Sequence, residues 1–189
     1  MNVRTLLAVL RFVLTHPVST RNKGAALLRF LRWQIGSRLL ACPVVHPWIN
    51  GARIYVSQGE TGLTGNIYNG LHEFPEMGFL LHFLQAGDHF VDIGANAGSY
   101  SVLAGRAIGA KTLAFEPLPS TYLRFTENIR LNHLEAVVQC RNVGLAAEPG
   151  VTRFTSSSDT MNHVVSASDV DVPFVEVSVS TLDAELGKF

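Results

Sequence analysis

Apolar residues recur along the chain with two periods, one typical of helices and one typical of strands. Helical spacing predicts helices over 5–14, 25–40 and 73–85, and a fourth helix is predicted to begin at 119 and end near 132. Short runs of β-forming residues predict strands over 53–56, 90–93, 112–115, 137–143, 151–155 and 175–179.

From residue 90 to residue 143 the predicted elements alternate as strand, helix, strand, helix and strand. This order predicts an α/β fold with a Rossmann-like, doubly wound sheet, because helical crossovers join parallel strands. In such sheets, ligands bind beyond the carboxyl ends of the strands. The residues that follow each predicted strand are therefore the first candidates for a functional site.

The loop after the strand 90–93 contains Gly94 and Gly98, which allow a tight turn and close approach of a ligand to the backbone. A dinucleotide fingerprint would need glycines where Asn96 and Ser99 stand, and a P-loop would need a lysine that this loop lacks. Asp92 precedes the first glycine by two residues, where its charge would repel a pyrophosphate and attract an ammonium group. The pattern favours a ligand with an amino-acid tail.

The next predicted strand ends at Glu116, at the spacing where nucleotide folds place a carboxylate on ribose hydroxyls. With Asp92 near an amino-acid tail and Glu116 on a ribose, the two acids match S-adenosylmethionine. Asn142, at the end of the third strand, is predicted either to hydrogen-bond the adenine or to serve as a turn residue. Each acid also has a structural alternative, in which Asp92 accepts backbone N–H bonds of the loop and Glu116 closes its strand.

Three motifs in this order resemble the FkbM family of S-adenosylmethionine-dependent methyltransferases. They are Asp-Ile-Gly-Ala-Asn-Ala-Gly-Ser-Tyr-Ser at 92–101, Phe-Glu-Pro-Leu-Pro at 115–119 and Asn-Ile-Arg-Leu-Asn at 128–132. The resemblance begins at Thr-Gly-Leu-Thr-Gly-Asn-Ile-Tyr (61–68) and extends to Ser-Thr-Leu-Asp (180–183), roughly two thirds of the chain.

The resemblance implies a class I methyltransferase fold and O-methylation of a hydroxyl on a sugar or secondary metabolite, with a small-molecule or glycan substrate. It implies that Asp92, Gly94, Asn96 and Gly98 line the methionine side of the cofactor and that Glu116 holds its ribose. In the family, a strand resembling Lys-x-Asp-x-Glu-Gly follows the Thr-Leu-Asp element, and this chain ends before reaching it. We therefore expect a truncated chain whose sheet lacks its C-terminal strands. The alternative function is a non-catalytic methyltransferase-fold protein that acts as a binding or membrane-surface module.

Charge divides the chain unevenly, although its formal net charge is zero. No acidic residue stands before position 60, and we predict a basic helical appendage over 1–58 followed by the methyltransferase domain over 59–189. The two helices of the appendage either pack on the domain with solvated arginines or lie on an anionic membrane surface, with Arg29, Arg32 and Trp33 near one face. Arginines interrupt both apolar runs, which argues against a membrane span or a signal peptide.

Few other chemical features stand out in the sequence. Cys42 and Cys140 lie far apart and are predicted to be free thiols in a reducing, cytoplasmic compartment. We expect no metal centre and no nucleic-acid partner. The glycine-rich stretch 61–70 is predicted to be a loop, either covering the cofactor or simply connecting two elements. Four residues are candidate bases by their chemistry alone: His72, Glu73, Asp159 and His163.

Overall fold

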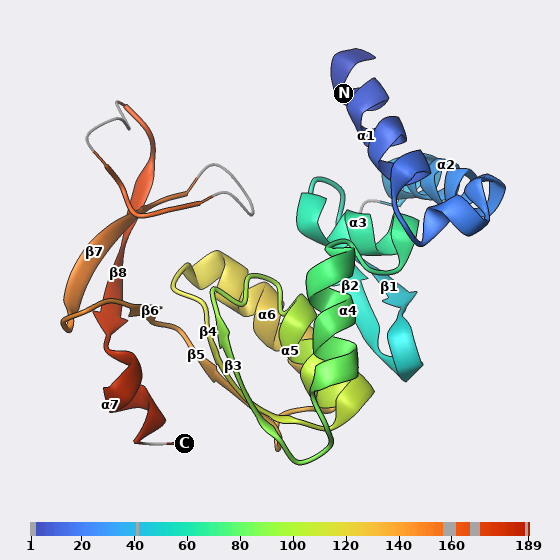
Figure 1. Cartoon of the computed structure of the whole chain (residues 1–189). Helices are drawn as coiled ribbons and strands as arrows, with labels where there is room; N and C mark the ends of the chain where they lie inside the picture. The colour runs from blue at the N-terminus through green and yellow to red at the C-terminus, as the bar shows by residue number, and fades with distance from the viewer. Residues whose placement is uncertain (1–2, 41, 157–161, 167–170, 188) are drawn as a thin grey trace. The chain divides into compact units, whose positions relative to one another are not determined.

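A computed structural model (Figure 1) describes residues 3–40, 42–156, 162–166, 171–187 and 189. The chain packs as two compact units, Met1–Phe83 and Leu84–Phe189. The domain boundary predicted between residues 58 and 59 came from sequence composition. It stays a prediction, because the two units are defined by packing.

The described residues of the first unit form four α-helices, a small hairpin and the short 3-10 helices η1 (Ser19–Arg21) and η2 (Ile49–Gly51). The helices are α1 (Val3–Thr15), α2 (Lys23–Leu39), α3 (Thr61–Asn69) and α4 (Phe74–Phe83). Strands β1 (Val44–Pro47) and β2 (Arg53–Val56) pair antiparallel, with Val44 opposite Val56. The helices predicted over 5–14, 25–40 and 73–85 and the strand over 53–56 are confirmed. Among the described residues, no helix is both long and apolar enough to cross a membrane.

The glycine-rich stretch 61–70 is a helix, so the prediction of a loop was wrong. Its glycines have structural roles that the composition did not reveal. A Cβ at Gly65 would lie 2.0 Å from Nδ1 of His72, so only glycine lets that ring pack against the helix. Gly70, at a φ of +85°, follows the last turn and donates its N–H to the carbonyl of Asn66. That this segment covers a cofactor stays a prediction.

Helix α2 packs on α3 through one face. Its first turn is capped by the side chain of Asn22, and Ala26, Phe30, Trp33 and Ser37 are buried. Nε of Arg29 donates to the carbonyl of Tyr68 at 2.8 Å, and the Phe30 and Tyr68 rings meet edge to face. Arg29 is therefore tied to the packed face of the helix.

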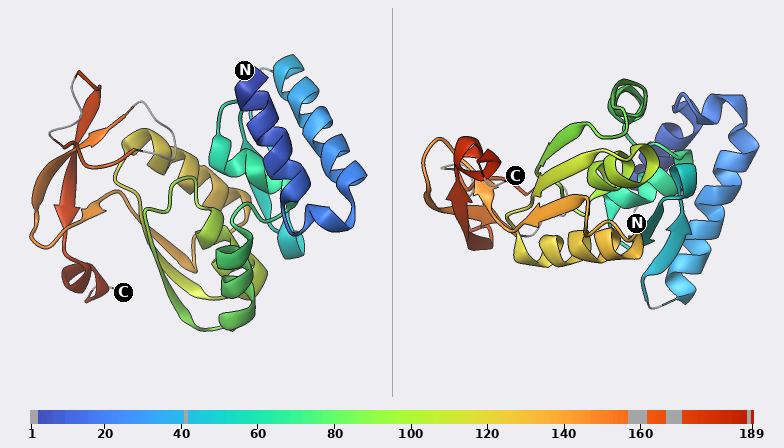
Figure 2. Two further views of the ribbon diagram at one scale, coloured as in Figure 1. Left: turned by 45° about the horizontal axis from the view of Figure 1, so that its top comes forward. Right: turned by 90° about the horizontal axis from the view of Figure 1, so that it is seen from below.

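The second unit is built around a parallel sheet. Strands β3 (His89–Ile93), β4 (Lys111–Phe115) and β5 (Val138–Arg141) lie in the order β3-β4-β5 and are parallel throughout. Helices α5 (Ser99–Val102) and α6 (Pro119–Leu131) connect them and pack against each other (Figures 1 and 2). The predicted α/β fold with alternating strands and helices is confirmed. The core includes the fully buried side chains of Leu103, Leu113, Phe115 and Phe125.

Helix α5 continues as a π-helical segment, η3 (Leu103–Ile108). A hydrogen bond over five residues marks the wider π turn: the N–H of Gly109 donates to the carbonyl of Ala104 at 3.0 Å. Gly105 lies close to the sheet, where a Cβ would be 3.1 Å from a methyl group of Val138. The segment ends at Gly109, whose φ is +91°.

A second small sheet follows β5. It contains β6 (Gly144–Leu145), β7 (Gly150–Thr155) and β8 (Phe174–Ser180) in the order β6-β8-β7, with β8 parallel to β6 and antiparallel to β7. The strands predicted over 151–155 and 175–179 are confirmed as β7 and β8. The chain continues into α7 (Leu182–Leu186), whose first turn is capped by the Thr181 hydroxyl.

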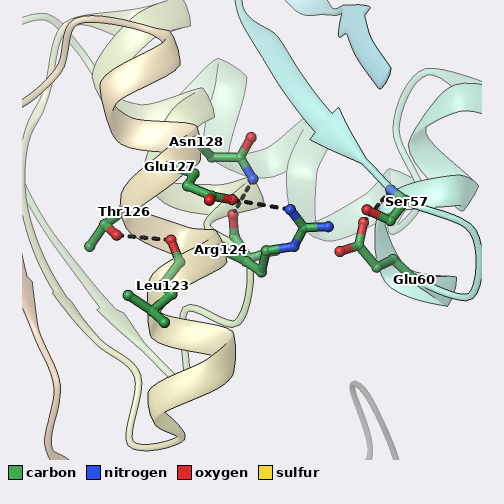
Figure 3. A network of polar contacts seen from close by, with 8 residues as sticks. Ser57, Glu60, Leu123, Arg124, Thr126, Glu127 and Asn128 are labelled. Carbon is green, nitrogen blue, oxygen red and sulfur yellow. Dashed lines mark hydrogen bonds and ion pairs between the residues drawn. The ribbon is translucent and has the colours of Figure 1, made fainter. Parts of the chain in front are cut away.

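Helix α6 carries a local polar network (Figure 3). Arg124 and Glu127 form an ion pair at 3.1 Å one turn apart, and the hydroxyl of Thr126 donates to the carbonyl of Leu123 at 2.8 Å. Both charged side chains are solvent-accessible, so the pair contributes at most about 1 kcal/mol. Within the first unit, the N–H of Ser57 donates to the carboxylate of Glu60 at 2.6 Å.

Candidate functional site

The loop after β3 is tied to the end of β4 by backbone hydrogen bonds. The N–H groups of Gly94 and Ala95 both donate to the carbonyl of Phe115, at 2.9 and 2.8 Å. Gly94 has a φ of +76°, and a Cβ at this position would meet no atom within 4 Å. The space beside the Gly94 backbone is therefore open, and the contact of Gly94 with a ligand stays a prediction.

Asn96 shapes the middle of this loop in a left-handed conformation, with a φ of +51°. Its side-chain oxygen accepts the N–H of the next residue, Ala97, at 2.6 Å. Its own backbone N–H donates to Oε2 of Glu116 at 2.9 Å. The loop after β3 and the acid after β4 are thus joined directly.

Glu116 is buried, and both of its carboxylate oxygens accept backbone N–H groups. Oε1 accepts the N–H of Leu118 and Oε2 accepts that of Asn96, each at 2.9 Å. Burial raises the pKa of Glu116 above its ordinary value, the two hydrogen bonds lower it, and the nearby charge of Asp92 raises it further. Because a carboxylate has about four acceptor positions, Glu116 keeps the capacity to accept two hydroxyl groups.

Asp92 lies on β3, buried beneath the loop. Its Oδ2 accepts the hydroxyl of Ser101 at 2.6 Å, and burial raises the pKa of Asp92, whereas the hydrogen bonds from Ser101 lower it. The structural alternative considered for Asp92 was acceptance of backbone N–H bonds of the loop, whereas the hydrogen bonds described for Asp92 come from Ser101 in α5. The contact of Asp92 with an ammonium group stays a prediction. Sequence reasoning missed Ser101, although a hydroxyl in the first turn of the following helix was a usable signal.

Gly98 begins helix α5 at a φ of +89°, with the ring of Phe125 close beside it. A Cβ at Gly98 would lie 2.5 Å from Cδ2 of that ring, so the structure accounts for this glycine through packing. The neighbouring Ala97 carbonyl accepts Nδ2 of buried Asn128 at 2.8 Å. Asn128 belongs to the third motif of the resemblance, and sequence reasoning had assigned it no role.

Asn142 lies after β5 and contacts the end of β4. Its Nδ2 donates to the carbonyls of Glu116 and Pro117, at 2.8 and 3.0 Å. These two bonds use both protons of the side-chain amide and fix the backbone that carries the buried acid. The contact of Asn142 with an adenine stays a prediction.

A cavity of about 110 Å³ opens at the carboxyl ends of β3 and β4. Gly94, Asn96 and Glu116 line it, and Phe154 and Asn162 contribute from β7 and the segment after it. Sites that enclose a small ligand measure about 300–1,000 Å³, so this cavity is too small to enclose such a ligand whole. No local pattern indicated that Phe154 or Asn162 would reach the cavity, because their positions depend on the packing of the second sheet.

The structure brings some of the predicted site residues together and separates others. Gly94, Asn96 and Glu116 share the cavity, whereas Asp92 lies beneath the loop and Gly98 against Phe125.

Of the four candidate bases, His72 and Glu73 belong to the first unit, and His163 of the second unit does not line the cavity. His72 packs against Gly65, and burial lowers its pKa. The backbone N–H of His163 donates to the hydroxyl of Thr155 at 3.0 Å. Asp159 lies outside the described residues. Within the described part of the chain, no group of three potential ligands could hold a metal ion.

No protein-family model and no curated protein matches the chain. Solved structures do match in part. TYW2 of Pyrococcus horikoshii, solved in complex with MeSAdo, matches with 23% identity over 56% of this chain and 37% of its own, at a TM-score of 0.45. A SAM-dependent methyltransferase from Agrobacterium tumefaciens matches with 13% identity over 56% of this chain and 33% of its own, at a TM-score of 0.41.

A third match is geranyl diphosphate C-methyltransferase from Streptomyces coelicolor, solved with S-adenosyl-L-homocysteine. It has 22% identity over 47% of this chain and 34% of its own, at a TM-score of 0.36. The chain spans 33–37% of the length of these three structures.

Proposed function

We propose that the second unit binds S-adenosylmethionine at the carboxyl ends of β3 and β4 and acts as the cofactor-binding part of a methyltransferase. One observation carries the proposal: a hydrogen bond from the N–H of Asn96 to the carboxylate of Glu116 connects the glycine loop to a buried acid. This arrangement presents open backbone at Gly94 and an acceptor for hydroxyl groups within one cavity. The sequence resemblance to the FkbM family supports the same ligand.

The charge of the site favours a cation over a phosphate. Asp92 and Glu116 are both buried, and burial raises the pKa of each because a low-dielectric setting disfavours their charged forms. No Lys or Arg stands among the described residues that line the cavity. S-adenosylmethionine carries a sulfonium and an ammonium group against one carboxylate, so its net positive charge stabilises ionised acids nearby. A pyrophosphate would be repelled.

Each site residue has a separate task in this proposal. Glu116 accepts the two ribose hydroxyls with the acceptor positions that its backbone bonds leave. Gly94 lets the ligand approach the loop, and Asn142 holds the backbone of Glu116 in place. When bound, the cofactor supplies a methyl group on a sulfonium that transfers in line to a nucleophile. The contribution of the chain is to orient that group and to exclude water from it.

For the acceptor, we propose a hydroxyl of a small molecule or glycan, as the FkbM resemblance implies, in the cytoplasm. Methyl transfer to hydroxylated acceptors, measured with labelled cofactor, tests this finer proposal. Such an assay also separates an active enzyme from a non-catalytic binding module, because only an active enzyme gives labelled product.

The direct test is a calorimetric titration of S-adenosylmethionine into the full chain and into Glu116→Gln. The glutamine keeps the shape of Glu116 but replaces one acceptor oxygen with a donor. Losing hydrogen bonds to a charged acceptor costs about 1.5–3 kcal/mol each, so we expect affinity to fall more than about tenfold. Glu127→Gln on the exposed side of α6 is the matched control, because it changes the charge equally at a distance from the cavity.

Equal affinity in wild type and Glu116→Gln would refute the assignment of Glu116. A folded wild-type chain that binds NAD instead of S-adenosylmethionine would refute the choice of ligand. Circular dichroism of each variant establishes that the compared proteins are folded.

A further inference from the structure

Helix α2 is apolar on two opposite faces. One face, with Ala26, Phe30, Trp33 and Ser37, is buried in the first unit. The other face carries four aliphatic residues at spacings of three and four, which places them in one stripe along the helix. This exposed stripe, hereafter the α2 stripe, consists of Leu28, Leu31, Ile35 and Leu39, whose exposed fractions run from 45% to 79%.

Arginines border the α2 stripe on both sides. By helical geometry, Arg32 lies beside Leu28 and Leu39 on one edge, and Arg38 lies beside Leu31 on the other. Both arginines are exposed, whereas Arg29 is held on the packed side by its bond to Tyr68. The helix therefore presents an apolar strip between two positive edges.

Helix α1 lies beside α2 (Figure 2). A groove of about 490 Å³ runs along the α2 stripe between residues of the two helices. Leu31, Ile35 and Leu39 line it from α2, and Leu6 lines it from α1. Arg38 also contributes to the wall, so a positive group stands beside an apolar channel. This pairing suits a molecule with an anionic head and a hydrocarbon tail.

The charge of the surrounding sequence indicates an anionic partner. Every charged residue from 1 to 59 is basic: Arg4, Arg11, Arg21, Lys23, Arg29, Arg32, Arg38 and Arg53. Anionic lipid surfaces attract such segments by about 1 kcal/mol per basic residue near the surface. An apolar strip with basic borders matches a helix that lies in the plane of the bilayer interface.

We propose that the α1–α2 face binds the surface of an anionic lipid membrane, with the α2 stripe entering the acyl boundary and Arg32 and Arg38 at the headgroups. The proposal concerns the first unit and is independent of the cofactor site. It assigns the membrane-facing residues to the stripe opposite Trp33, since Trp33 itself is buried.

The test is co-sedimentation of the full chain with vesicles of phosphatidylcholine containing about 30 mol% phosphatidylserine, compared with phosphatidylcholine alone, at about 0.1 M salt. We expect wild type to bind the anionic vesicles, and Arg32→Ala/Arg38→Ala to bind about thirtyfold more weakly. Leu31→Gln/Ile35→Gln should lose at least about tenfold, because each exposed side chain forfeits its burial in lipid.

Matched controls come from the second unit. Leu123→Gln removes an exposed aliphatic residue from α6, and Arg106→Ala removes an exposed positive charge, and neither should change vesicle binding. An independent readout is a polarity-sensitive dye on exposed Cys42, three residues beyond the last residue of α2, which should shift to the blue on anionic vesicles. This readout requires no change in the helix itself.

Three results would overturn the proposal. The first is a folded wild-type chain that does not bind anionic vesicles. The second is unchanged binding by Leu31→Gln/Ile35→Gln. The third is a wild-type chain that is dimeric in solution while this variant is monomeric and no lipid is bound, because a second copy would then cover the stripe.

Discussion

Gly98 is the position where a single methyl group should reveal how tightly α5 and α6 fit together. Replacing Gly98 with alanine places a Cβ 2.5 Å from Cδ2 and 2.9 Å from Cε2 of Phe125, a fully buried ring. The residue must also keep a φ of +89°, which favours glycine. Two separate costs therefore meet at one site.

The two costs can be sized from general values. A left-handed conformation costs an alanine about 1–2 kcal/mol, and inserting a methyl group into a packed core costs about 1–3 kcal/mol. Alanine returns about 0.4–1 kcal/mol by restricting the unfolded chain. We therefore expect Gly98→Ala to lower the free energy of unfolding by about 1–4.5 kcal/mol, which is a substantial part of the stability of a domain of this size.

Gly94→Ala is the matched control, because Gly94 has a φ of +76° but no neighbour within 4 Å of the added methyl group. It carries the conformational cost alone, so it should destabilise less than Gly98→Ala by about 1–3 kcal/mol. Adding Phe125→Val to Gly98→Ala removes the ring atoms that clash. The double variant should then cost less than the sum of the two single changes by a similar amount.

The measurement must report on the second unit. Both tryptophans, Trp33 and Trp48, lie in the first unit, so their fluorescence would follow the wrong part of the chain. Hydrogen exchange of backbone amides in β4 measures the opening energy of the parallel sheet directly. Equal losses in Gly98→Ala and Gly94→Ala, or strict additivity with Phe125→Val, would refute the argument from packing.

Three further predictions concern Asp92, Asn128 and Cys140. Burial raises the pKa of Asp92 in the folded chain, so the free energy of unfolding falls as pH rises from the pKa of the unfolded chain through that of the folded chain. Asp92→Asn should therefore be more stable than wild type at neutral pH, and this advantage should vanish below about pH 4. Thermal melts from pH 3 to 8 measure the difference, and a constant difference across that range would contradict the prediction. Asn128→Ala should lower the free energy of unfolding by about 1–3 kcal/mol, because the loop carbonyl that it serves loses its donor; urea titration measures the loss, and an unchanged midpoint would count against the bond. Burial raises the pKa of the Cys140 thiol to about 12, so iodoacetamide at neutral pH should alkylate exposed Cys42 in the folded chain and Cys140 after unfolding; mass spectrometry of labelled peptides reads both, and rapid native labelling of Cys140 would refute its protection.

Local patterns predicted the sheet and its loops well. The apolar runs at 90–93 and 112–115 became β3 and β4 because short β-forming runs between turn signals have few alternatives inside an α/β unit. The same reasoning placed Gly94, Asn96 and Glu116 at strand ends, and the structure brings these three into one cavity. Here the chain order itself determines proximity.

Prediction was weaker where a residue's role depends on distant packing. The stretch around Gly65 looked like a loop by composition, but the glycine is required by a ring that packs from seven residues further on, His72. Phe154 reaches the cavity from a separate sheet, which no local pattern reveals. Asp92 was assigned to a ligand from its charge and its motif, and its bond to Ser101 was missed because that bond depends on how α5 packs against β3.

The π-helical segment Leu103–Ile108 has a consequence for how this chain tolerates changes in length. A π turn holds about one residue more than an α turn, so the helix between β3 and β4 contains a spare residue. Deleting one residue there, such as Ala107, converts the wide turn to ordinary α geometry and leaves the start of β4 in register. A deletion within α5 itself would displace the buried side chains of Ser101 and Val102 from the packed face of the helix, and we expect it to be tolerated less well. The same helix thus offers one tolerant site and one intolerant site for the gain and loss of residues in evolution.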